Sequence, residues 1–140
     1  MPLRLMRSFA HRLGRRGAFL GLHGVAWIFY GVGILVDPAF GVKRGLGWTE
    51  EVVPFTWLAG LWIGCGLAAL IYAPLRRPGR DGQGFALVMI PPALWAVAYL
   101  LGIGTYTRGG FNAVVWIAVA GTVVIVAGLP EPPSARRGRD

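Results

Sequence analysis

Residues 18–36 read AFLGLHGVAWIFYGVGILV, a run of nineteen residues without a charged side chain. At 1.5 Å per residue this run makes roughly 28 Å of helix, about the thickness of the hydrocarbon core of a bilayer. The basic pair Arg15-Arg16 stands just before the run, and the turn pair Asp37-Pro38 follows it directly. The stretch therefore predicts a helix that crosses a membrane.

Three further apolar runs of similar length follow, at residues 52–73, 84–103 and 111–129. The run at 84–103 contains Pro91 and Pro92, which remove two backbone donors and predict a kink in that helix. Four such runs in a short chain predict a bundle of four transmembrane helices.

Composition agrees with a membrane protein. Hydrophobic residues make up 55% of the chain and charged residues 14%, whereas soluble domains have about a quarter charged residues. We therefore expect an all-α, polytopic integral membrane protein. In chain order its expected parts are a basic leader at 1–17, the four-helix transmembrane domain at 18–129 and a Pro/Arg-rich tail at 130–140.

The leader, MPLRLMRSFAHRLGRRG, alternates apolar and basic residues with helical spacing. One interpretation is a basic amphipathic helix that lies on an anionic membrane leaflet. The other is a short charged leader that only sets the topology, and the sequence favours neither. A twin-arginine export signal fits poorly, because no cleavage site follows and the apolar run is long for a signal peptide. We expect a retained anchor.

Orientation follows from the lysines and arginines between the runs. Eleven lie in the leader, the 74–83 loop and the tail, and three lie in the alternate loops, 37–51 and 104–110. We expect the protein in the cytoplasmic membrane, and the positive-inside rule places both termini and the 74–83 loop in the cytoplasm. Anionic lipid is the expected partner of the cytoplasmic arginines near the spans: Arg4, Arg7, Arg12, Arg15, Arg16, Arg76, Arg77 and Arg80.

Glycines recur at helical spacing inside the first two spans. Gly24 and Gly31 are seven residues apart in the first, and Gly60 and Gly64 form a G-x-x-x-G motif in the second. Small residues at such spacing let helix backbones approach closely. We expect these four to form packing faces, either within the chain or in a homo-oligomer, although glycine is also simply common in membrane helices.

Little chemistry remains inside the spans, which contain no Asp, Glu, Lys or Arg. Small multidrug exporters need a carboxylate in the membrane, and disulfide-generating oxidoreductases need paired cysteines, whereas this chain has Cys65 alone. No metal-binding spacing or nucleotide-binding loop is present. We expect no enzyme activity, no catalytic, cofactor or metal site, and no nucleic-acid partner, since topology already explains the arginines.

The most distinctive polar side chain in the spans is His23, one turn before Trp27. A His-x-x-x-Trp pair resembles the gate of influenza-type proton channels, which makes a proton relay one hypothesis. The other is a neutral histidine hydrogen-bonded inside the bundle, since burial disfavours its charged form. Trp27, Trp62 and Trp95 lie near mid-span and are expected to fill the core or face lipid rather than bind a ligand.

A layer of polar groups is expected at the depth of His23. Counted from the cytoplasmic ends, His23, Thr122 and the pair Pro91-Pro92 lie at similar depth. The prolines deprive the carbonyls of residues 87 and 88 of their intrahelical donors, and such groups need other donors in lipid. We expect the His23 ring and the Thr122 hydroxyl to supply them.

As a whole the chain resembles small four-span membrane proteins of unknown function from actinobacteria and their phages or prophages. The resemblance rests on the Arg-rich leader, GVAWIFYGVGILVDP, RRPGRD, PPALWAVAYL and VAGLPEPP. It implies no catalytic residues. It leaves two hypotheses: a non-enzymatic accessory membrane protein with a structural or interaction role, or a holin-like or channel-type protein that permeabilises the membrane.

Overall fold

The computed structural model of the chain is described over residues 2–37, 52–75, 81–104 and 106–130, and every regular element in these ranges is a helix. The helices are α1 (Pro2–Val36), α3 (Phe55–Tyr72), α4 (Asp81–Leu101) and α5 (Gly109–Gly128). Each contains a stretch that is long and apolar enough to cross a membrane. The predicted all-helical architecture with four such helices is confirmed.

The helix ends differ from the predicted ends by a few residues, for local reasons. Pro54 has φ −58° and ψ 141°, so α3 begins at Phe55 rather than at residue 52. The Pro54 carbonyl accepts the N–H of Trp57 at 3.0 Å. After the next loop, α4 begins at Asp81 rather than at residue 84, and the Asp81 carboxylate in its first turn suits the positive end of the helix dipole.

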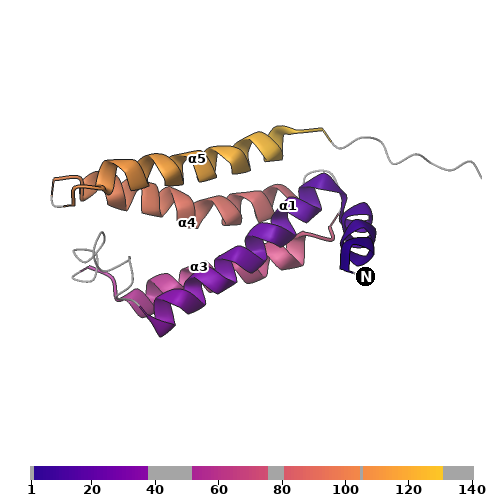
Figure 1. Cartoon of the computed structure of the whole chain (residues 1–140), viewed down its shortest axis with the longest axis horizontal. Coiled ribbons are helices and arrows are strands. Elements are labelled where there is room, and N and C mark those ends of the chain that lie inside the picture. The colour runs from indigo at the N-terminus through magenta and orange to yellow at the C-terminus, as the bar shows by residue number, and fades with distance from the viewer. Residues whose placement is uncertain (1, 38–51, 76–80, 105, 131–140) are drawn as a thin grey trace, which may run out of the picture.

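The helix of the leader does not run straight into the first span. Gly14 has φ 71° and ψ 175°, a conformation that glycine adopts without steric penalty. Figure 1 shows the residues before this point as a separate helical segment set at a steep angle to the rest of α1. The apolar stretch of α1 runs over Leu13–Val36. The leader is thus helical, and its position on a leaflet stays a prediction.

The four helices form two antiparallel pairs. α1 packs along α3, and α4 packs along α5 (Figure 1). The pairs diverge toward the end of the bundle where α1 ends and α5 begins, which we call the open end. They converge where α4 begins and α5 ends, which we call the closed end.

Small residues that recur every seven positions line the contact between α1 and α3, and we call this contact the seam. A Cβ atom added at Gly24 would lie 2.8 Å from the Gly66 carbonyl oxygen, and one added at Gly31 would lie 2.8 Å from that of Ala59. The seam pairs α1 with α3 in reverse order: Gly17 with Ala73, Gly24 with Gly66, and Gly31 with Ala59. Packing at Gly24 and Gly31 is confirmed, and the partner helix belongs to the same chain.

Of the two alternatives for Gly60 and Gly64, packing within the chain is excluded, and packing in a homo-oligomer stays a prediction. A Cβ atom at either position would meet nothing within 4 Å, and both residues are exposed. The reason is helical phase, because each residue turns the helix by about 100°. The close contacts of α3 lie at Ala59 and Gly66, so Gly60 and Gly64 are rotated away from α1.

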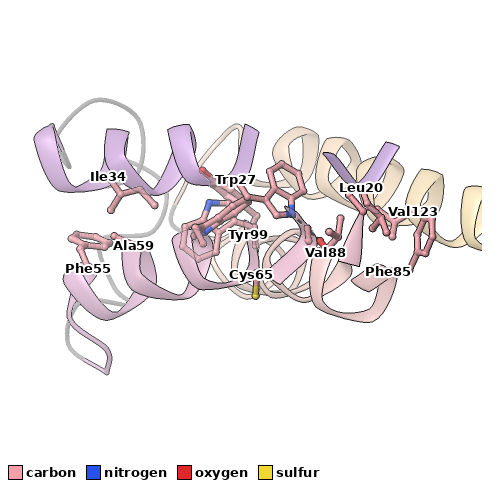
Figure 2. Close-up of a cluster of buried hydrophobic side chains, with 14 of the residues drawn as sticks. Leu20, Trp27, Ile34, Phe55, Ala59, Cys65, Phe85, Val88, Tyr99 and Val123 are labelled. Carbon is pink, nitrogen blue, oxygen red and sulfur yellow. Dashed lines mark hydrogen bonds between the residues drawn. The ribbon is translucent and has the colours of Figure 1, made fainter. Parts of the chain in front are cut away.

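Large apolar side chains cover both the inside and the outside of the bundle. Figure 2 shows the buried set, which runs along the bundle from Ile34 and Phe55 to Leu20 and Val123. The outer surface of the helices is apolar as well, and includes the exposed Leu22, Phe29, Ile71, Leu101 and Ile125. Soluble monomers rarely expose so much apolar surface. This distribution suggests a multi-pass membrane protein.

Candidate functional site

Five aromatic side chains fill the middle of the bundle. Trp62 on α3 is fully buried at the centre, and rings from the other three helices surround it. The ring centroids of Trp27, Tyr30, Trp95 and Trp116 lie 4.8, 4.2, 5.4 and 5.4 Å from that of Trp62. We call these five residues the aromatic layer. It confirms that Trp27, Trp62 and Trp95 fill the core.

The polar atoms of the aromatic layer link two helices, α1 and α4. The Trp27 indole donates to the Val88 carbonyl at 3.0 Å (dashed line in Figure 2), which connects α1 to α4. The Trp95 indole donates to the Tyr30 hydroxyl at 2.9 Å and connects α4 to α1. The Trp62 Nε1 atom is buried without a hydrogen-bond partner. The layer is therefore held by directional bonds as well as by ring packing.

The side chain that donates a hydrogen bond to a carbonyl before the prolines is not one of the two that were expected, His23 and Thr122. Pro91 and Pro92 are fully buried inside α4, and Val88 stands four residues before Pro92. Trp27, rather than His23 or Thr122, reaches the Val88 carbonyl. Trp27 lies one helical turn beyond His23, about 6 Å farther along α1. Its longer side chain reaches across to α4.

His23 and Thr122 make bonds within their own helices instead. His23 Nδ1 lies 3.1 Å from the carbonyl oxygen of Phe19, and the two rings stack with centroids 3.9 Å apart. The His23 ring also meets the edge of Trp27 at 5.3 Å. Thr122 is exposed, and its hydroxyl donates to the Val119 carbonyl at 2.6 Å. The expected polar layer is therefore not assembled, although the His23–Trp27 contact is present.

Arg16 joins three helices at the closed end. Its Nε atom lies 2.6 Å from the Asp81 carboxylate on α4. Its Nη1 atom donates to the carbonyls of Ala127 at 2.7 Å and Leu129 at 3.1 Å, at the end of α5. The guanidinium also lies 5.0 Å from the centre of the Phe85 ring. We call this set the arginine clamp.

The arginine clamp corrects one part of the expected lipid-binding surface. Arg16 was expected to meet lipid head groups, but its side chain is 19% exposed and bonded inside the protein. Arg15 is exposed and remains available for that role. The side chains of the other expected arginines lie outside the described residues: Arg4, Arg7, Arg12, Arg76, Arg77 and Arg80.

A groove of about 710 Å³ lies between the diverging pairs at the open end. It is lined by α1, by the end of α4, by the turn that follows and by the start of α5. The lining residues are Phe29, Tyr30, Gly33, Ile34, Asp37, Tyr99, Tyr106, Asn112, Val115 and Trp116. Half of them are aromatic, and one carries a carboxylate. We call this hollow the outer groove, and it is the candidate binding site.

The outer groove is not predictable from the sequence. Its residues lie at the ends of different spans, where aromatic side chains are expected at any membrane interface. Neither Asp37 nor Asn112 belongs to a recognisable motif. The one usable signal was the carboxylate next to the end of the first span.

Comparisons of the chain with protein-family models, with curated proteins and with solved structures find no match.

Proposed function

We propose that this chain is a non-enzymatic, multi-pass protein of the cytoplasmic membrane with a structural or interaction role, encoded by an actinobacterium or one of its phages. The observation that carries the proposal is the aromatic layer. Trp62 and Trp95 are almost fully buried there, and the rings pack against one another across the centre of the bundle. A centre filled by packed rings favours a rigid scaffold over a water-filled path through one chain.

Both termini and the closed end face the cytoplasm in this proposal. The uneven distribution of basic residues supports it, with eleven on one set of segments and three on the other. The exposed Arg15 at the closed end would then lie at the level of the cytoplasmic head groups, where anionic lipid attracts it.

A bend of α4 at Pro91-Pro92 belongs to the same proposal. A proline inside a helix removes one backbone bond and pushes against the preceding turn. The bond from Trp27 to the Val88 carbonyl supports a bend, because it satisfies the acceptor that Pro92 leaves without a donor. The prolines would thus tilt α4 toward α1 at the aromatic layer.

The alternative is a holin-like protein that permeabilises the membrane as an oligomer. One observation favours it: the face of α3 that carries Gly60 and Gly64 has open space over both glycines. A second copy could approach closely there. In this alternative the pore would form between several copies of the chain and not through the aromatic layer of one copy.

Induced expression in bacteria with a potential-sensitive dye separates the two functions. A scaffold should leave the membrane potential and growth unchanged once the protein is confirmed in the membrane. A holin-like protein should collapse the potential after a delay, and Gly60→Leu with Gly64→Leu should prevent the collapse. A known holin expressed from the same promoter serves as the positive control. Collapse that the leucine variant prevents would refute the scaffold role.

A further inference from the structure

The outer groove is walled by two pairs of aromatic rings. Tyr30 and Trp116 meet at 5.6 Å between centroids on its inner side, and Tyr99 and Tyr106 meet at 6.4 Å beside the end of α4. Aromatic rings attract a further ring in offset-stacked or edge-to-face arrangements, at centroid separations of about 4.5–7 Å. The walls therefore favour a ligand that has a flat ring.

These walls carry hydrogen-bond donors that no group of the described chain accepts. The Tyr30 hydroxyl already accepts a 2.9 Å bond from α4, so its own proton is available to donate. Within the described ranges, no hydrogen bond engages the Trp116 indole or the hydroxyls of Tyr99 and Tyr106. Behind the wall, the Trp62 N–H is buried without a partner as well. Because an indole can only donate, this part of the bundle is short of acceptors. A ligand that brings carbonyl oxygens would pair these donors.

The outer groove is accessible from the apolar outer surface of the bundle. Phe29 and Val115 line the groove, and both are exposed on that surface, Phe29 by 73%. In a multi-pass membrane protein such a surface faces lipid. A molecule dissolved in the membrane can therefore reach the groove without passing through water.

We propose that the outer groove binds the ring of a lipid-soluble quinone. The ring would pack against the aromatic walls, and its carbonyl oxygens would accept hydrogen bonds from their hydroxyls and from the Trp116 indole. Such bonds are stronger in surroundings of low polarity than in water. The groove volume of about 710 Å³ is in the usual range for small-molecule sites. The proposal concerns binding alone. It depends neither on the scaffold role nor on the charge of Asp37, which also lines the groove.

Two features distinguish a quinone from other molecules of the membrane. An acyl chain would fit the apolar walls, but it has no acceptor for the donors and no flat ring. The ester carbonyls of a phospholipid are acceptors, but they lie on flexible chains beside a charged phosphate and offer no ring to the walls. A quinone has two carbonyl oxygens on opposite edges of one neutral, flat ring, and so it uses both the ring pairs and their donors.

The test is equilibrium dialysis of radiolabelled probes against the full chain in phosphatidylglycerol nanodiscs, with empty discs subtracted. The probe is dimethylnaphthoquinone, whose two methyl groups block addition of the Cys65 thiol. The control is dimethylnaphthalene, which has the same ring system without the carbonyls. Affinities are expressed per mole fraction of probe in the disc lipid, so that partitioning into the bilayer cancels. We expect saturable quinone binding at least about tenfold tighter than that of the hydrocarbon.

Substitutions that remove the donors should weaken quinone binding selectively. The double variant Tyr99→Phe with Tyr106→Phe keeps both rings and should weaken it about tenfold, and Trp116→Phe should weaken it about fivefold. Binding of the hydrocarbon to the double variant should stay unchanged. The matched control is Tyr72→Phe, at a tyrosine of the closed end whose hydroxyl donates to Gln83 and which does not line the groove. It should leave quinone binding unchanged.

Three results would overturn the proposal: no saturable binding, equal affinity for the quinone and the hydrocarbon, or unchanged quinone affinity in the double tyrosine variant. The discs supply phospholipid in large excess, so the first result would also mean that the groove prefers a lipid. The second would make it a site for any apolar ring. Each variant is first checked for the wild-type melting temperature in detergent. If Trp116→Phe fails this check, the double tyrosine variant, which preserves the packing of the rings, decides the outcome.

Discussion

The indole nitrogen of Trp27 on α1 donates a 3.0 Å hydrogen bond to the carbonyl oxygen of Val88 on α4. Val88 stands four residues before Pro92, so this is the carbonyl that the proline leaves without an intrahelical donor. An unpaired carbonyl in apolar surroundings is unfavourable by several kcal/mol. The Trp27–Val88 bond therefore connects the α1–α3 pair to α4 at a point where α4 needs a donor.

Removal of this donor should destabilise the bundle. Trp27→Phe should lower the free energy of unfolding, because it leaves a buried carbonyl unsatisfied. The loss should exceed that from the smaller ring alone by about 1–3 kcal/mol. Trp62→Phe is the matched control, since it also shrinks a buried indole but its Nε1 has no partner. Thermal unfolding in detergent, followed by near-UV circular dichroism, measures both variants. Equal losses would contradict the role of the bond.

The same bond predicts a specific coupling with Pro92. In Pro92→Ala the new backbone N–H can donate to the Val88 carbonyl within α4. Trp27→Phe should then lower the melting temperature less in the Pro92→Ala background than in the wild type. A double-mutant cycle of the two substitutions measures this coupling. Additive effects would show that Trp27 and Pro92 act independently.

Two glycines within the spans should respond differently to added volume. Gly24→Ala places a Cβ atom 2.8 Å from the Gly66 carbonyl oxygen, so α1 and α3 must move apart. Overpacking of this kind is unfavourable by about 1–3 kcal/mol. Gly64→Ala should be tolerated, because nothing lies within 4 Å of the new atom. Melting temperatures in detergent test the pair, and a larger loss at Gly64 would contradict the α1–α3 seam.

The arginine clamp should contribute to stability through its geometry. Arg16→Lys keeps the charge but cannot reach Asp81 and the end of α5 with separate, fixed donors. We expect it to lower stability by about 1 kcal/mol or more, since bonds to charged groups are worth about 1.5–3 kcal/mol each. Arg15→Lys, at an exposed neighbour, should have no effect. If the Arg16→Lys variant were as stable as the wild type, the positive charge at position 16 would be sufficient for stability without the separate bonds of the guanidinium.

The proposed topology makes a prediction that depends on no side-chain contact. Reporter domains active only outside the cytoplasm should be active when fused after Gly45 and inactive when fused after Arg80 or Asp140. The reverse pattern would show that the protein has the opposite orientation in the membrane. Activity after Asp140 together with activity after Gly45 would exclude four spans.

The sequence by itself determined the helices and their composition. Runs such as 18–36 are long and apolar enough that only a helix can satisfy their backbone in a membrane, so four helices follow from local pattern alone. The seven-residue spacing of Gly24 and Gly31 also indicated a packing face, because the helical repeat places them on one side.

Only the tertiary structure decided which groups meet. Gly60 and Gly64 have the better-known packing motif, yet the phase of α3 against α1 turns them outward. Trp27 rather than His23 bonds to Val88, because the partner of a polar atom depends on the depth and rotation of two helices at once. Asp37 shares a groove with Trp116 because the helix pairs diverge. Local pattern encodes the face of one helix, whereas these contacts arise from the relative placement of several.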